Sequence, residues 1–260
     1  MPPDYRIVYC FNGWTWIWRQ LVLSLTSLKR FIPDPNKVIV FYGPPRFKEH
    51  IEWLEPRCDL RLVDTPLHDP ASINRRVIHK NKFYGSCMKI HSYELDTPNM
   101  FWVDCDTIIH GDLTEMLEPD FDILVSRWDH SEGKTLMKGL CKELNLPHMD
   151  IMMNGMLVFK NHTHNKMRDD YVGFLEDIFE GRLQVPVLNR MEIYAFMLSL
   201  IKFKQRGGKV VIMPPNWHQY AGGKYVQHLS RREIATWMEE KLFTPELYNL
   251  VEIGEAKSDW

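Results

Sequence analysis

The sequence lacks the marks of a secreted, a membrane-spanning or a nucleic-acid-binding protein. Its five cysteines are odd in number, lie far apart and form no CxxC pair, which argues against a disulfide framework or a zinc site. The formal net charge is only −2, so bulk charge indicates no nucleic-acid partner. The start of the chain resembles no signal peptide, and no apolar run approaches the ~20 residues that a membrane span needs. We therefore expect a cytoplasmic protein.

Apolar runs and helical patterns alternate along the first part of the chain, as in an α/β protein. Strands are predicted over 5–11, 37–43 and 60–66, with helices over 14–31 and 46–54. Because these strands are continuously apolar, we expect a mainly parallel sheet that helices cover on both faces.

The rest of the chain continues this pattern. The predicted elements are a helix over 85–95, strands over 99–109, 121–128, 154–161 and 209–215, and helices over 164–180 and 189–203. The weakly periodic stretch 129–153 is expected to form a loop over a site. We predict one domain, compatible with being part of a longer protein. Its parts would be a nucleotide-binding half (about 1–112), an acceptor half (about 113–230) and a helical tail (231–260).

Two aspartates, Asp104 and Asp106, interrupt the apolar stretch FWVDCDTIIHGDL. Their carboxylates would repel each other, and burying either one unpaired is costly. Residues i and i+2 of a strand lie on one side, and ligands of open α/β sheets collect at the carboxyl ends of strands. A magnesium or manganese ion held by both carboxylates would relieve the repulsion. Alternatively, one aspartate caps the next turn and the other pairs with a lysine.

Further motifs follow in a regular order. Lys89 lies 15 residues before Asp104, NGMLVFKN begins at Asn154, NRMEIYAF contains Glu192, and VVIMPPNWHQY precedes KYVQHLS, which contains His228. With VDCDTII, these motifs resemble the GT-A glycosyltransferases that use nucleotide-sugar donors. The resemblance is strongest to the retaining family 8 enzymes (glycogenin- and galactosyltransferase-like) and covers nearly the whole chain. It implies a GT-A fold, a Rossmann-like, mainly parallel sheet flanked by helices.

The resemblance also implies a metal site and a donor site. Mn²⁺ or Mg²⁺ would be held by Asp104, Asp106 and His228. The residues expected to contact a nucleotide-sugar donor, UDP-linked by preference, are Tyr9, Phe11, Asn12, Gly13, Lys89, Asp104, Cys105, Asp106 and Gly155. The residues expected to act on the reacting sugar or its acceptor are Lys89, Asp129, Asn154 and Glu192. Stacking on the base is the functional interpretation of the Tyr9 and Phe11 rings, and core packing is the alternative.

The implied reaction moves a hexose, from UDP-galactose or UDP-glucose, to a glycan or another hydroxyl acceptor with retention of configuration. The sequence departs from the family at 191–192, where Met-Glu replaces an Asp-Gln pair, and after His228, where no Lys-Pro-Trp follows.

One alternative function is that of a sugar-nucleotide nucleotidyltransferase. That class carries a Gly-rich basic loop after the first strand, whereas CFNGWTWIWRQ has one glycine. A second alternative is a non-catalytic sugar- or protein-binding module on a GT-A scaffold.

Overall fold

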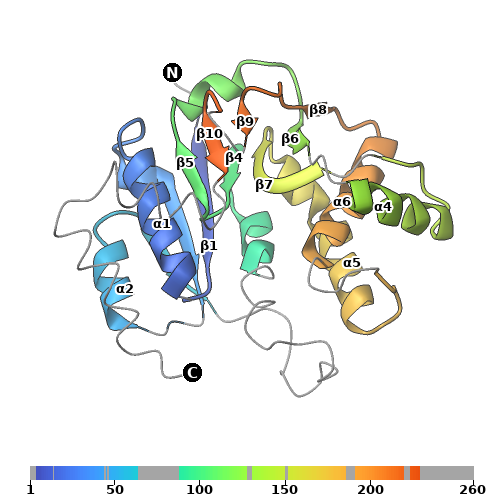
Figure 1. The fold of residues 1–260 in the computed structure, drawn as a ribbon, viewed down its shortest axis with the longest axis horizontal. Coiled ribbons are helices and arrows are strands. Elements are labelled where there is room, and N and C mark those ends of the chain that lie inside the picture. The colour runs from blue at the N-terminus through green and yellow to red at the C-terminus, as the bar shows by residue number, and fades with distance from the viewer. Residues whose placement is uncertain are drawn as a thin grey trace. The chain divides into compact units, whose positions relative to one another are not determined.

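The structure is a computed structural model that describes residues 4–13, 15–43, 45, 47–63, 88–127, 131–149, 152–185, 191–219 and 223–228. The chain divides into two compact units. Figure 1 shows their helices and strands, coloured from the N-terminus to the C-terminus. The α1 unit contains the described residues within 6–64, 103–118 and 214–228, and the α6 unit those within 4–5, 65–102 and 119–213.

The α1 unit holds most of the N-terminal strands and the segments that follow the two aspartates. Its elements are β1 (Tyr5–Phe11), α1 (Thr15–Leu28), the 3-10 turn Pro35–Lys37, β2 (Val38–Tyr42), α2 (Lys48–Leu54), β3 (Asp59–Leu62), β5 (Thr107–Ile109), the 3-10 turn Leu113–Leu117, β9 (His218–Gln219) and β10 (Val226–His228). Here β1 pairs in parallel with β2, and β2 with β3. A separate three-stranded sheet has the order β5-β10-β9.

The α6 unit holds the remaining strands and the three later helices. Its elements are the 3-10 segment Met88–Glu94, β4 (Asn99–Val103), β6 (Ile123–Arg127), α4 (Ser131–Glu143), β7 (Met152–Phe159), α5 (Thr163–Phe179), α6 (Met191–Gln205) and β8 (Val210–Ile212). Strand β6 pairs in parallel with β8 and antiparallel with β7. The strand order is β3-β2-β1 in the α1 unit and β4-β7-β6-β8 in the α6 unit, and these mixed, mainly parallel strands flanked by helices confirm the predicted fold class.

The hydrophobic pattern explains why these segments fold as they do. Every residue of β2 is buried, as expected for a strand covered on both faces. Helix α5 buries Met167, Tyr171, Phe174 and Ile178, a spacing of three or four residues that gives one apolar face. The helix packs against α6, in which residues 194–201 are all buried.

Three sequence predictions are corrected by the structure. The single strand predicted over 99–109 is two strands, β4 and β5, which belong to different sheets and are separated by the turn that carries the aspartates. Helix α4 occupies much of the stretch predicted as a loop over 129–153. The helix predicted over 85–95 is a 3-10 segment from residue 88.

The other boundaries match to within a few residues, and the tail predicted over 231–260 lies outside the described residues. The single-domain organisation with its two halves stays a prediction. Within the described part of the chain, each helix is too short or too polar to cross a bilayer.

Candidate metal and donor site

The turn between β4 and β5 places both aspartates in one short loop. Asp104 follows the end of β4, and Asp106 immediately precedes Thr107, the first residue of β5. The turn conformation, rather than the strand alternation expected from the sequence, therefore sets how the two carboxylates lie. Cys105, between them, is buried and its Sγ donates to the carbonyl oxygen of Cys10 at 3.3 Å. That placement agrees with the expectation that this side chain points into packing.

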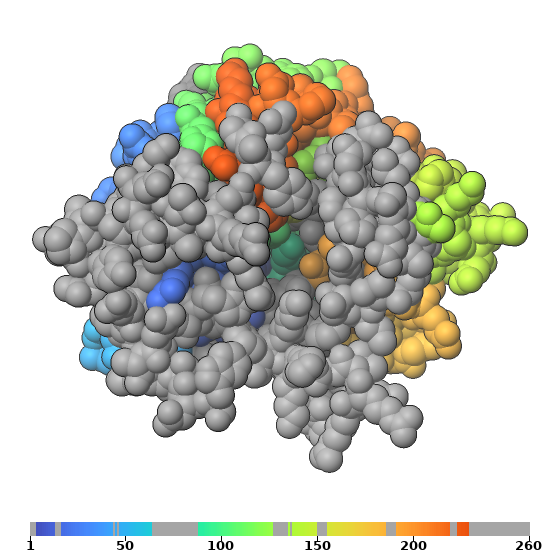
Figure 2. Space-filling view, viewed as in Figure 1, coloured from blue at the N-terminus to red at the C-terminus, as the bar shows by residue number. Residues whose placement is uncertain are grey.

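Strand β10 brings the third residue of the site from more than 100 positions further along the chain. It pairs antiparallel with β5, and the register sets His228 opposite Thr107. Figure 2 shows the orange surface of this late segment beside the green surface of the segment that follows the aspartates. Close packing holds the β5 side in place, since a Cβ on Gly111 would lie 2.9 Å from the Tyr225 ring.

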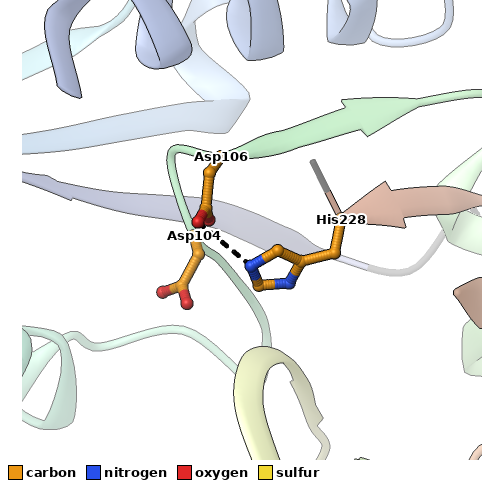
Figure 3. Close-up of side chains that lie close together, drawn as sticks. All are labelled: Asp104, Asp106 and His228. Carbon is orange, nitrogen blue, oxygen red and sulfur yellow. Dashed lines mark ion pairs between the residues drawn. The ribbon is translucent and has the colours of Figure 1, made fainter. Parts of the chain in front are cut away.

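Asp104, Asp106 and His228 therefore form one cluster (Figure 3). One ligand atom from each lies within 4.8 Å of the others, and His228 Nε2 is 3.1 Å from Asp106 Oδ2. The His228 side chain is only 12% exposed, while that of Asp106 is 31% exposed. The cluster is thus largely shielded from water, while the Asp106 carboxylate stays partly exposed.

The donor set of this cluster fits a divalent cation. Two carboxylates supply the hard oxygen ligands that Mg²⁺ and Mn²⁺ prefer, and imidazole is an accepted ligand of the transition metals. Three protein ligands leave further coordination positions for water or diphosphate oxygens. All three predicted metal ligands are brought together by the fold, although their role as ligands stays a prediction.

A second histidine packs against the cluster. The ring of His218, on β9, lies 5.6 Å from that of His228 between centroids, at an interplanar angle of 69°. Burial, and secondly the charge of His228, lowers the His218 pKa to about 3, while Asp106 acts in the opposite direction. His218 is therefore neutral near pH 7 and adds no positive charge that would compete with a cation.

The predicted base-contacting segment lies at the end of β1. Tyr9 and Phe11 are fully buried, and Phe11 packs among the rings of Trp18, Tyr42 and His50. The Tyr9 hydroxyl bonds to Ser24 at 3.0 Å, and burial raises the Tyr9 pKa far above its ordinary value. Both rings contribute to the core, as the packing alternative expects.

The two residues that follow β1 leave the strand. Asn12 is buried, and Gly13 has φ 78°, a left-handed conformation that favours glycine. Donor contact by any of the residues from Tyr9 to Gly13 stays a prediction.

The other predicted donor and catalytic residues belong to the α6 unit. Lys89 is buried, with Nζ 4.4 Å from the centroid of the Trp102 ring. Glu192 is half-buried on α6, and its charge adds to the larger effect of burial in raising the pKa of Tyr93.

Two further predicted residues lie on β7, and one is not described. Gly155 is buried on β7, and Asn154 belongs to the same strand. Asp129 lies outside the described residues. The roles of these residues stay predictions.

A group of buried hydroxyls next to the aspartates was not predicted from the sequence. The group consists of Ser24 and Ser27 on α1 and Thr107 on β5, each at most 1% exposed. Ser24 Oγ forms a hydrogen bond with Thr107 Oγ1, and Ser27 Oγ accepts one from the backbone N–H of Ile109 on β5. Their sequence signal is weak but present: two serines stand three residues apart among the leucines in the second half of the mainly apolar helix TWIWRQLVLSLTSL.

No protein-family model matches the chain, and no curated protein matches it. Solved structures do match. Galactosyltransferase LgtC, in complex with donor and acceptor sugar analogs, is 12% identical with a TM-score of 0.58, over 95% of this chain and 99% of that one. The glycosyltransferase GlyE of Streptococcus pneumoniae TIGR4 is 14% identical with a TM-score of 0.53, over 97% of this chain and 64% of that one.

Mouse xyloside xylosyltransferase 1 is 12% identical with a TM-score of 0.52, over 88% of this chain and 98% of that one. At these identities the likeness concerns the fold. This chain has the GT-A fold of these glycosyltransferases, as the order of its sequence motifs predicted.

Proposed function

We propose that this protein is a metal-dependent glycosyltransferase that moves a hexose from a nucleotide-diphosphate sugar to a glycan or another hydroxyl acceptor. The observation that carries the proposal is the Asp104, Asp106 and His228 cluster within a GT-A fold. UDP-galactose and UDP-glucose are the favoured donors, since LgtC is a galactosyltransferase and the sequence motifs resemble those of UDP-sugar enzymes.

The role of the cluster follows from its charges. When bound, Mn²⁺ or Mg²⁺ supplies Lewis-acid stabilisation of the negative charge that builds on a departing diphosphate. Asp104, Asp106 and His228 would hold that ion, and the two carboxylates would offset most of its charge. The neutral ring of His218 would pack against His228 and keep that side of the site free of added charge.

The other residues predicted from the sequence would act on the sugar and the acceptor. The ammonium of Lys89 would stabilise the diphosphate or bond sugar hydroxyls, and Asn154 and Gly155 would contact the sugar ring. Retention is proposed from the sequence resemblance, with the leaving diphosphate accepting the acceptor's proton. In an inverting reaction, Asp129 or Glu192 would instead serve as the general base.

The first test is calorimetry with UDP in the presence and absence of Mn²⁺. Wild-type protein is expected to bind UDP only with Mn²⁺, and Asp106→Ala is expected to abolish that binding. Asp169→Ala is the matched control, because it removes a carboxylate that is 96% exposed on α5 and is expected to bind as wild type does. Binding that ignores the metal, or that survives in Asp106→Ala, would exclude the proposed metal–diphosphate site.

Activity assays then separate the enzyme classes. Transfer or slow hydrolysis of a UDP-hexose supports the glycosyltransferase. Release of pyrophosphate from UTP and a sugar 1-phosphate would instead identify a nucleotidyltransferase. Metal-dependent UDP binding without turnover of any donor in a panel of UDP- and GDP-sugars would favour the binding module.

A further inference from the structure

A chain of three buried hydroxyl groups ends on the backbone of the turn that carries the aspartates. The Tyr9 hydroxyl lies 3.0 Å from Ser24 Oγ, Ser24 Oγ lies 3.1 Å from Thr107 Oγ1, and Thr107 Oγ1 donates to the carbonyl oxygen of Asp104 at 2.8 Å. All three hydroxyl-bearing residues are 0% exposed. The chain thus joins β1, α1 and β5 to the carbonyl of Asp104.

The direction of these hydrogen bonds is fixed by proton count. Each hydroxyl has one proton, and that of Thr107 is donated to Asp104. Ser24 must therefore donate to Thr107, and Tyr9 must donate to Ser24. All three hydroxyl protons are thus donated in hydrogen bonds, which satisfies groups that would be costly to bury alone.

A second bond ties the same two elements together one helical turn further along. Ser27 Oγ accepts from the backbone N–H of Ile109 at 2.9 Å and donates to the carbonyl oxygen of Ser24 at 2.7 Å. Two serines on one face of α1 therefore fix β5 at two points, Thr107 and Ile109.

Thr107 is connected to the backbone of all three residues in the cluster. It follows Asp106 directly, its hydroxyl bonds the carbonyl of Asp104, and its backbone lies opposite His228 in the strand register. A shift of Thr107 would therefore change the spacing between the two carboxylates and the imidazole. A site of this kind binds a cation well only when its ligands are already held at the required spacing.

We propose that Thr107, held in place by Ser24 and Tyr9, is a positioning residue that sets the spacing of Asp104, Asp106 and His228 for a divalent cation. This inference rests on the metal site of the proposed function. The hydroxyls do not touch the cation; they act through the backbone of the turn.

The test measures the dissociation constant for Mn²⁺ alone by electron paramagnetic resonance, in which free Mn²⁺ gives the signal. Thr107→Val keeps the shape of the side chain and removes the hydroxyl, and it is expected to raise the Kd about tenfold or more. Thr107→Ser restores the hydroxyl and is expected to stay within about twofold of wild type. Ser24→Ala should raise the Kd as well, and adding it to Thr107→Val should give less than the product of the two effects because both break one chain.

Ser199→Ala is the matched control for loss of a buried hydroxyl. Ser199 is 0% exposed on α6 and donates to the carbonyl oxygen of Ala195 at 2.6 Å, within its own helix. Its loss is expected to lower the melting temperature about as much as Thr107→Val does, while leaving the Kd unchanged. Tyr9→Phe, which keeps the ring, provides a milder break of the chain should Thr107→Val fail to fold, and is expected to raise the Kd by about two- to fivefold.

The outcomes separate the two proposals. Wild-type protein that binds no Mn²⁺ would overturn the metal site and the positioning role together. Tight binding by wild type, with Thr107→Val and Tyr9→Phe binding equally well, would overturn only the positioning role and leave the hydroxyls as structural groups.

Discussion

Helices α1 and α6 both bury serine side chains, but they use them in different ways. Ser199 of α6 bonds the carbonyl of Ala195, four residues back in its own helix. Ser24 and Ser27 of α1 bond Thr107 and Ile109, more than 80 residues away in the chain, and Ser27 also donates to the carbonyl of Ser24 in its own helix. A local bond satisfies the hydroxyl and constrains nothing outside the helix, whereas a long-range bond fixes one segment against another. Buried serine therefore indicates a positioning role only when its partner is distant.

Ion pairs also differ in how far they are exposed. Arg168 and Glu94 of the α6 unit are 40% and 52% exposed, and Lys48 and Glu52 of the α1 unit are 84% and 56% exposed. In the α1 unit, the His228 and Asp106 pair is more buried and belongs to the candidate site. Exposed pairs stabilise little, while a shielded, partly open pair is suited to bind a ligand.

The largest effects are expected from two matched core substitutions, one in α1 and one in α6. Leu21→Ala in α1 and Leu198→Ala in α6 each remove a side chain that is 0% exposed, and each is expected to lower the free energy of unfolding by about 2–5 kcal/mol. Only Leu21→Ala should also weaken Mn²⁺ binding, because α1 holds the turn. Denaturant unfolding measures the loss of stability, and the Mn²⁺ titration measures the loss of affinity. An equal loss of Mn²⁺ affinity in both variants would contradict the claim that α1, and not α6, holds the turn.

A smaller effect is expected from His50, which lies on α2 and stacks on Trp18 of α1 at 4.0 Å between ring centroids. Burial lowers the His50 pKa from 6.5 to about 4, so the unfolded chain takes up a proton at higher pH than the folded protein. The folded state is therefore favoured in full above about pH 6.5, and this stabilisation is lost as pH falls towards 4. The loss is roughly 3 kcal/mol by the usual conversion of a pKa difference.

The variant His50→Phe removes the titrating group and keeps an aromatic ring. Its free energy of unfolding, measured from pH 7 to pH 4, should fall less steeply than that of wild type. Trp53→Phe, which alters another buried ring of α2 that carries no titrating group, serves as the control and should leave the wild-type slope unchanged. A slope for His50→Phe that equals that of wild type would contradict a neutral, buried His50.

The smallest effect is expected from the surface ion pairs of the α6 unit. Arg168→Ala removes the partner of Glu94 and Asp169, and these three side chains are 40%, 52% and 96% exposed. The free energy of unfolding should change by less than about 1 kcal/mol, and that change should shrink further in high salt. Chemical unfolding at two ionic strengths measures it, and a loss of several kcal/mol would show that this cluster is not a solvated surface pair.

Much of the fold could be predicted from local sequence pattern. The apolar runs of β1 and β2 and the helical spacing of α5 and α6 identify elements whose period depends only on neighbouring residues. The boundary within 99–109 was missed because VDCDTII is apolar on both sides of the aspartates. Strand β5 is distinguished from β4 only by its pairing with β10, which lies far along the chain.

The candidate site was likewise only partly predictable. The residue types were evident from local sequence: two carboxylates one residue apart, a late histidine, and the order of motifs typical of the GT-A fold. That His228 lies opposite Thr107, that His218 packs beside it, and that Ser24 holds the turn follows only from the folded arrangement. Strand register and helix packing bring together residues 80 or more positions apart, and no local pattern encodes which of many serines, threonines and histidines will meet.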